Sequence, residues 1–164
     1  MQTAYLLIGG NLGDRLSYLK QACFFIEQYA GTITAQSSIY ETAAWGLEDQ
    51  PSFLNRVLVL QTTLAPDILM KELLAIEEKM GRTRSVKFGS RIIDIDILLI
   101  NGLIIDTPLL HLPHPALPER KFALAPLNEV APDLIHPIEK KTINQLLLEC
   151  IDPLNVQKYS DNAG

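Results

Sequence analysis

Apolar residues recur along the first part of the chain with two alternating periods, one typical of strands and one typical of helices. The apolar run at residues 3–9 predicts a first strand. A helical stripe follows and stops before Gly31: Leu16, Leu19, Cys23, Ile26 and Ala30. Residues 32–40, rich in Thr, Ser and Ile, predict a second strand.

The same alternation of strand and helix then repeats. Residues 53–63 predict a third strand, and Pro66 is suited to the first turn of a helix because that turn needs no N–H from it. The stripe of this second helix ends before Gly81: Ile68, Leu69, Leu73, Ile76 and Met80. A basic loop at residues 82–90 leads into the apolar stretch 90–100, which predicts a fourth strand.

Beyond that strand the pattern becomes irregular. Asn101-Gly102 predicts a tight turn that pairs the fourth strand with residues 103–106 in a hairpin. Proline-rich loops follow, with short helical pieces near residues 122–127 and 142–150. From about Asp152 onward we expect a frayed tail.

This order of elements predicts the fold class. A β-α-β-β-α-β succession is typical of an α+β, ferredoxin-like antiparallel sheet with flanking helices, here with an added β-hairpin. We expect a single domain over residues 1–164, of which 152–164 form the tail. The fold class by itself does not indicate a function.

Composition narrows the class of protein. The chain has 164 residues, 48% of them apolar, and a net charge of -5, which disfavours a nucleic-acid binder. Its apolar runs are too short for a membrane span, and its start does not resemble a secretory signal. Two cysteines do not form a disulfide framework, so a cytoplasmic protein is expected.

Two aspartates stand in the aliphatic stretch SRIIDIDILLI. Asp94 and Asp96 alternate along the predicted strand, so their carboxylates share one face and repel unless a cation lies between them. Mg²⁺ suits such a pair because it binds carboxylates together with substrate phosphates. The alternative is an edge strand whose aspartates face water. The surrounding isoleucines and leucines favour the metal site.

Four cations precede this pair, at Arg82, Arg84, Lys87 and Arg91. Arginine forks match phosphate oxygens, so these residues and the aspartates together indicate phosphoryl transfer, although a solvated basic loop is the alternative. If the strand is regular, Arg91 faces away from the aspartates. It reaches the same phosphates only if the chain bends or the strand begins after it.

Other motifs carry weaker signals. His114 lies between prolines, and neither His111 nor His136 gives it the spacing of a zinc site. The glycine-rich GGNLGD near the start lacks the Lys-Ser/Thr of a P-loop, so it indicates only a tight turn after a strand.

Four segments together resemble one family. GGNLGDR, YET..WG..DQPSFLN, GR.R....GSRIIDIDILL and LPHP....ER.F.L.PL...AP look like 6-hydroxymethyl-7,8-dihydropterin pyrophosphokinase, over about Tyr5 to Pro137. This folate-pathway family transfers pyrophosphate from ATP to a pterin alcohol and releases AMP.

The resemblance implies a role for each matching position. It implies two Mg²⁺ ions at Asp94 and Asp96, with ATP as co-substrate, and catalysis by Arg82, Arg91 and Asp96. The nucleotide contacts that it implies are Glu77, Arg84, Arg91, Ile97, His114 and Arg120. The pterin contacts that it implies are Thr42, Gly46, Phe53, Asn55, Asp94 and Phe122. We expect small-molecule partners and a monomer.

Five positions depart from the family pattern: Trp45, Phe53, Phe88, Ser90 and Ala116. They bear on loop closure and on the fit of the pterin pocket. Two other functions compete with the transferase. One is a D-x-D glycosyltransferase, for which 164 residues is short, and the other is a non-catalytic binding module, which gives the aspartates and arginines no shared purpose.

Overall fold

The computed structural model describes residues 1–43, 51–81 and 91–160. An antiparallel sheet forms its centre, with strand order β5-β1-β4-β3-β8 and with β2 also paired to β4. The strands of this sheet are β1 (Gln2–Gly10), β2 (Thr32–Gln36), β3 (Tyr40–Thr42), β4 (Phe53–Thr62), β5 (Asp94–Ile100) and β8 (Val156–Lys158).

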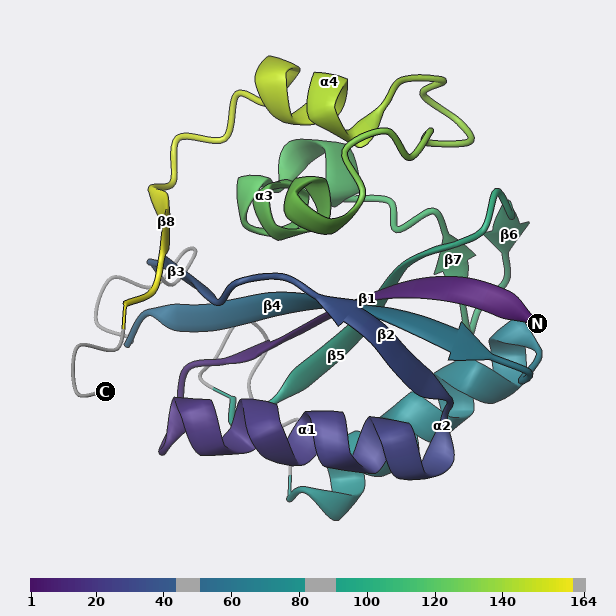
Figure 1. The fold of residues 1–164 in the computed structure, drawn as a ribbon, viewed down its shortest axis with the longest axis vertical. Helices are drawn as coiled ribbons and strands as arrows, with labels where there is room; N and C mark the ends of the chain where they lie inside the picture. The colour runs from purple at the N-terminus through teal and green to yellow at the C-terminus, as the bar shows by residue number, and fades with distance from the viewer. Residues whose placement is uncertain (44–50, 82–90, 161–164) are drawn as a thin grey trace.

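Helices cover both faces of this sheet (Figure 1). On one face lie α1 (Arg15–Tyr29) and α2 (Pro66–Lys79), and on the other lie α3 (Lys121–Val130) and α4 (Ile143–Glu149). A short 3₁₀ helix, η1 (Leu117–Glu119), precedes α3. The expected mixed architecture of an antiparallel sheet with flanking helices is therefore confirmed.

Strand alternation divides the core between the two layers. Leu6 and Ile8 of β1 pack in the cluster that includes α1 and α2, whereas Leu7 between them packs in the cluster that includes α3 and α4. The same alternation in β5 sends Ile95 and Ile97 into the first cluster. Asp94 and Asp96 therefore face the other layer.

The helix boundaries follow the expected chemistry. The Asp14 side chain caps α1 by accepting a hydrogen bond from the Ser17 amide at 3.1 Å. Pro66 occupies the first turn of α2, and Gly81 follows that helix with a φ of +92°, a conformation that glycine adopts without strain. Among the described residues, no helix is both long and apolar enough to cross a membrane.

The hairpin expected at Asn101-Gly102 is wrong in its pairing. The turn forms, but β6 (Ile105–Asp106) pairs with β7 (His111–Leu112) in a separate two-stranded sheet instead of with β5. Asn101 pairs with Thr3 of β1: its backbone amide donates to the Thr3 carbonyl at 2.9 Å, and its side-chain oxygen accepts from the Thr3 backbone amide. The turn is thus tied to β1.

Two other expectations need correction. Residues 32–40 form two strands rather than one, because the chain leaves the β4 ladder between β2 and β3. The tail expected from Asp152 is partly ordered, since β8 pairs with β3 and the Tyr159 amide donates to the Ile39 carbonyl at 2.8 Å. These backbone groups of the tail form hydrogen bonds with the otherwise open edge of β3 and of the residue before it.

Candidate active site

Two hollows adjoin at the start of β5. The larger has a volume of about 660 Å³ and lies between the sheet and the α3–α4 layer, and the smaller, of about 300 Å³, lies toward α2. Four residues line both hollows: Arg91, Asp94, Asp96 and Arg120. The carboxylate pair therefore stands at a junction that two ligands could reach from different sides.

The strand begins at Asp94, which settles how Arg91 is placed. Because Arg91 precedes the strand, its side chain does not have to alternate with the aspartates. Its guanidinium donates to Asp94 Oδ2 at 2.8 Å and lies 5.9 Å from the centre of the Phe53 ring. Arg91 thus reaches the carboxylate pair and the wall of the larger hollow together.

Glu77 of α2 supports the strand between the two aspartates. Its side chain is only 2% exposed, and Oε2 accepts a hydrogen bond from the Ile95 amide at 2.6 Å. Among the described residues β5 pairs only with β1, so this carboxylate satisfies an amide on the outer edge of the strand. Glu77 also lines the smaller hollow.

His114 offers a neutral donor to the smaller hollow. Burial and, to a lesser extent, the Arg120 charge lower the pKa of this imidazole to about 4, against an opposing contribution from Asp94. Its Nδ1 accepts a hydrogen bond from the Ala116 amide at 3.2 Å. Because neutral imidazole carries one proton, that proton is on Nε2.

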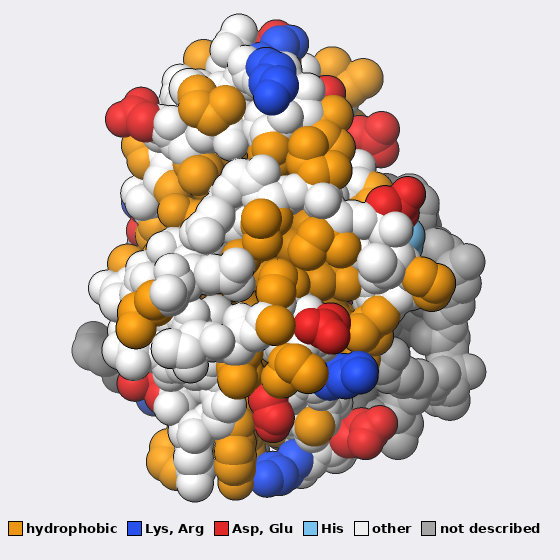
Figure 2. Space-filling view, turned by 90° about the vertical axis from the view of Figure 1, so that its right-hand side faces the viewer, with side chains coloured by type: hydrophobic (Ala, Val, Ile, Leu, Met, Phe, Trp, Pro, Cys, Tyr) orange, Lys and Arg blue, Asp and Glu red, His pale blue; other side chains and the backbone are white. Residues whose placement is uncertain are grey.

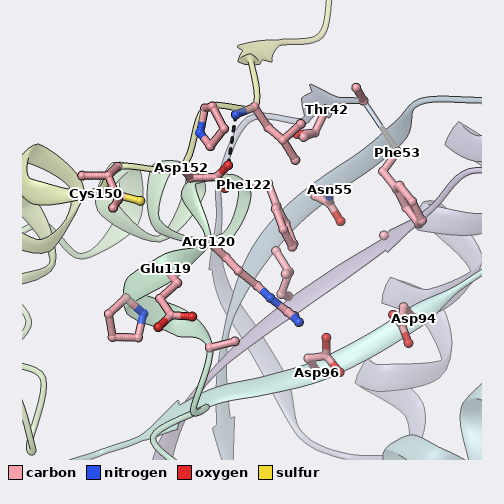
Figure 3. Close-up of a pocket in the computed structure, with 18 of the residues that line it drawn as sticks. Thr42, Phe53, Asn55, Asp94, Asp96, Glu119, Arg120, Phe122, Cys150 and Asp152 are labelled. Carbon is pink, nitrogen blue, oxygen red and sulfur yellow. Dashed lines mark hydrogen bonds between the residues drawn. The ribbon is translucent and has the colours of Figure 1, made fainter. Parts of the chain in front are cut away.

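The larger hollow has aromatic walls and polar groups at one end (Figure 3). Phe53 and Asn55 come from β4 and Phe122 from α3, and in this view Asn55 lies between the two rings. Thr42 adds a buried hydroxyl that has no hydrogen-bond partner among the described groups. Such a slot suits a flat ring with polar edges.

Gly9 makes room for the amide of Asn55. A Cβ at Gly9 would lie 2.0 Å from Asn55 Oδ1 and 2.7 Å from the Leu54 carbonyl oxygen. The glycine-rich turn therefore does more than reverse the chain, because it determines where an Asn of the larger hollow can lie.

Most of the predicted site residues that the structure describes line these hollows. Ile97 is the exception: it lies in the core, 3% exposed, and lines neither hollow, so its expected contact with the nucleotide stays a prediction. The predictions for Gly46, Arg82 and Arg84 lie outside the described residues, as do Trp45, Phe88 and Ser90.

The donor set at the junction fits Mg²⁺. No group of three or more His, Cys, Asp or Glu side chains suited to a metal occurs in the described parts of the chain, so an all-protein cage is absent there. Mg²⁺ does not need one, since one or two carboxylates together with substrate phosphates and waters complete its shell. Asp94 and Asp96 supply such carboxylates.

Two adjoining hollows, a shared carboxylate pair and arginines at the junction define a class of protein: a transferase that moves an anionic group between two small molecules. Comparison with known proteins agrees. The model of the 7,8-dihydro-6-hydroxymethylpterin-pyrophosphokinase (HPPK) family matches residues 5–132, and the chain belongs to that family.

Two curated bacterial relatives match over most of their length, and a longer fungal one matches over part of it. The 2-amino-4-hydroxy-6-hydroxymethyldihydropteridine pyrophosphokinase of Aquifex aeolicus is 43% identical over 145 residues, which cover 88% of this chain and 90% of the relative. The enzyme of the same name from Bacillus subtilis is 48% identical over 128 residues, 77% of each chain. In fission yeast, the folic acid synthesis protein fol1 is 37% identical, but the match covers only 21% of that longer protein.

Solved structures share the fold. A crystal structure of Plasmodium falciparum HPPK-DHPS with pteroate superposes with a TM-score of 0.74 at 18% identity, covering 90% of this chain. The matched part is 42% of that longer chain. At this identity the likeness concerns the fold alone.

Proposed function

We propose that this protein transfers pyrophosphate from ATP to the hydroxymethyl group of 6-hydroxymethyl-7,8-dihydropterin and releases AMP, a step of tetrahydrofolate biosynthesis. One observation carries the proposal: Arg91, Asp94, Asp96 and Arg120 line both hollows. An acceptor in one hollow and a nucleotide in the other would meet at these charged groups. Family membership and the names of the relatives support the same reaction.

The larger hollow takes the pterin in this proposal. Phe53 and Phe122 provide flat apolar surfaces, and Asn55 offers both a donor and an acceptor to the amide edge of the ring. Asn55 is 6% exposed and the Thr42 hydroxyl is buried without a described partner. A ligand that pairs with such groups recovers the free energy lost by their burial.

The smaller hollow takes the nucleotide. His114 directs its Nε2–H to an oxygen acceptor without adding charge, while Arg120 and Arg91 attract the phosphates. Two Mg²⁺ ions would be held by Asp94 and Asp96 together with phosphate oxygens. When bound, they neutralise charge on the attacking and leaving oxygens.

The reaction then depends mainly on positioning. The hydroxymethyl oxygen attacks the β-phosphorus, a new P–O bond forms, and the hydroxyl proton passes to solvent water. The bond from that phosphorus to the α-phosphate oxygen breaks and releases AMP. Arg91 stands next to Asp94 and can follow the transferring group because it lines both hollows. Transfer through a loose transition state needs no strong base.

The sheet order supports a finer description of the fold. With β2 and β3 taken together, β5-β1-β4 and that pair reproduce the order of a ferredoxin-like split βαβ unit, and we include this topology in the proposal. We also propose a single-domain cytoplasmic monomer that does not bind nucleic acid. On the face drawn in Figure 2, Lys and Arg side chains are few and form no broad basic patch, which supports the last point.

The test is the identity of the nucleotide product. Incubation with ATP, Mg²⁺ and the pterin alcohol should release AMP and yield the pterin pyrophosphate, both resolved by ion-pair chromatography. Release of ADP, or no turnover, would refute the proposed reaction. Asp96→Asn should lower turnover by about 10²-fold or more, because it removes charge from the metal site. Asp133→Asn, at an exposed aspartate outside both hollows, is the matched control.

A further inference from the structure

Asn11, in the turn after β1, holds backbone groups from two distant segments. Its side-chain Oδ1 accepts a hydrogen bond from the backbone amide of Arg91 at 2.9 Å. Its backbone amide donates to the Arg91 carbonyl at the same distance. Its Nδ2 donates to the Pro51 carbonyl at 3.0 Å. The residue is 1% exposed, so these bonds are shielded from water.

Gly10 allows this close arrangement. A Cβ at Gly10 would lie 2.3 Å from the carbonyl oxygen of Ile92 and 3.1 Å from that of Arg91. The backbone of residues 91–92 therefore runs directly against residues 10–11, at a distance that a larger side chain would prevent. Gly9 thus determines the place of Asn55, while Gly10 and Asn11 together determine the place of the backbone at Arg91.

The consequence concerns the Arg91 side chain. With the amide and the carbonyl of Arg91 both bound by Asn11, its Cα has little freedom, and the guanidinium starts from a fixed point three residues before Asp94. The bond from Asn11 to Pro51 acts on the chain two residues before Phe53, in the wall of the larger hollow.

We propose that Asn11 is a positioning residue, which holds Arg91 at the junction of the two hollows and so acts on the transfer step through Arg91. This inference rests on the proposed function. It differs from a stabilising role alone, in which removal of Asn11 would lower stability without changing the contribution of Arg91 to turnover.

A double-mutant cycle separates these roles. Wild type, Asn11→Ala, Arg91→Ala and the double variant are compared for AMP release from ATP and the pterin alcohol at saturating Mg²⁺. Asn11→Ala should lower kcat by about 10–100-fold, the size expected for a misplaced catalytic group. In the Arg91→Ala background the same change should cost less than about 3-fold, because residues that act through one another are not additive.

Thr62→Val is the matched control. Thr62 is 1% exposed and, like Asn11, joins two backbone groups: its hydroxyl donates to the Ala30 carbonyl at 2.6 Å and accepts from the Leu64 amide at 3.1 Å. It lies at the far end of β4 from Asn55. Thr62→Val should lower the unfolding midpoint while kcat stays at the wild-type value.

Each outcome has a distinct meaning. Equal losses from Asn11→Ala in both backgrounds, or wild-type turnover of the single variant, would overturn the positioning role while the proposed function stands. A wild type that releases no AMP would refute the proposed function, and the inference with it. If Asn11→Ala does not fold, the cycle is run with Asn11→Ser, whose shorter side chain falls short of the Arg91 backbone amide, and additivity there would again overturn the role.

Discussion

Glu77 gives the sharpest test of how the site is supported, because its charge and its hydrogen bond can be removed separately. Glu77→Ala removes the acceptor for the Ile95 amide, whereas Glu77→Gln keeps an amide oxygen of the same reach. If Glu77 mainly supports β5, the Gln variant should retain most of the stability and most of the turnover.

The magnitude follows from the contact. A hydrogen bond to a charged acceptor contributes about 1.5–3 kcal/mol, and a buried donor left without a partner costs a similar amount. Water from the adjoining smaller hollow can reach the Ile95 amide once the side chain is gone, which limits the loss. We expect Glu77→Ala to cost about 2 kcal/mol, or about 4–8 °C in Tm for a chain of this size, and Glu77→Gln to cost about 1 kcal/mol or less.

The assay is urea unfolding followed by far-UV circular dichroism, with AMP release measured on the same samples. Glu78→Ala is the control, because Glu78 is the next residue of α2 and is exposed. Equal destabilisation by Gln and Ala would show that the hydrogen bond is not the source of the stability. A Gln variant of full stability without turnover would instead assign the Glu77 charge to nucleotide handling.

Two further predictions concern Gly9 and His114. Gly9→Ala should weaken pterin binding about 10-fold or more in a titration, because the new Cβ would displace Asn55, whereas Gly102→Ala, with nothing within 4 Å of its Cβ, should bind as wild type. The His114 pKa of about 4 lies below its unfolded value of 6.5. Its contribution to the pH dependence therefore fades as pH rises above 6.5. Stability falls as pH drops from 6.5 towards 4, because in that range the unfolded state binds more of the His114 proton than the folded state does. In urea unfolding at pH 7 and pH 5, His114→Gln should lose less stability than wild type, and an equal loss would contradict the burial of a neutral imidazole.

The elements that could be predicted from the sequence are long enough for their own residues to show a periodic pattern of apolar positions. The stripes of α1 and α2 bury Leu19, Ile26, Leu69, Leu73 and Ile76 against one sheet face, so a period read along the chain matches the contacts. The pairings after β5 could not be read this way. In β6, β7 and β8 the strands have two or three residues, too few to show an alternation.

The site residues also fall into those that the sequence reveals and those that it does not. Asp94 and Asp96 were found because two charges in an aliphatic strand are conspicuous in a sequence. Asn11 was missed because its partners are backbone atoms of Arg91 and Pro51, and a sequence carries no sign of which backbone groups will lie together. The glycine spacing of GGN was the available signal, but it indicates a close approach without naming the partner.

Contacts from three directions fix the start of β5, so turnover should be sensitive to mutation of the residues that make these contacts. β1 pairs along one edge, Glu77 binds the Ile95 amide on the other, and Asn11 holds the chain at Arg91. A reaction that depends on positioning loses rate when its groups move by about 1 Å. Buried residues that touch neither substrate should therefore affect kcat as much as some that line the hollows, provided that their contacts end on the backbone between residues 91 and 96.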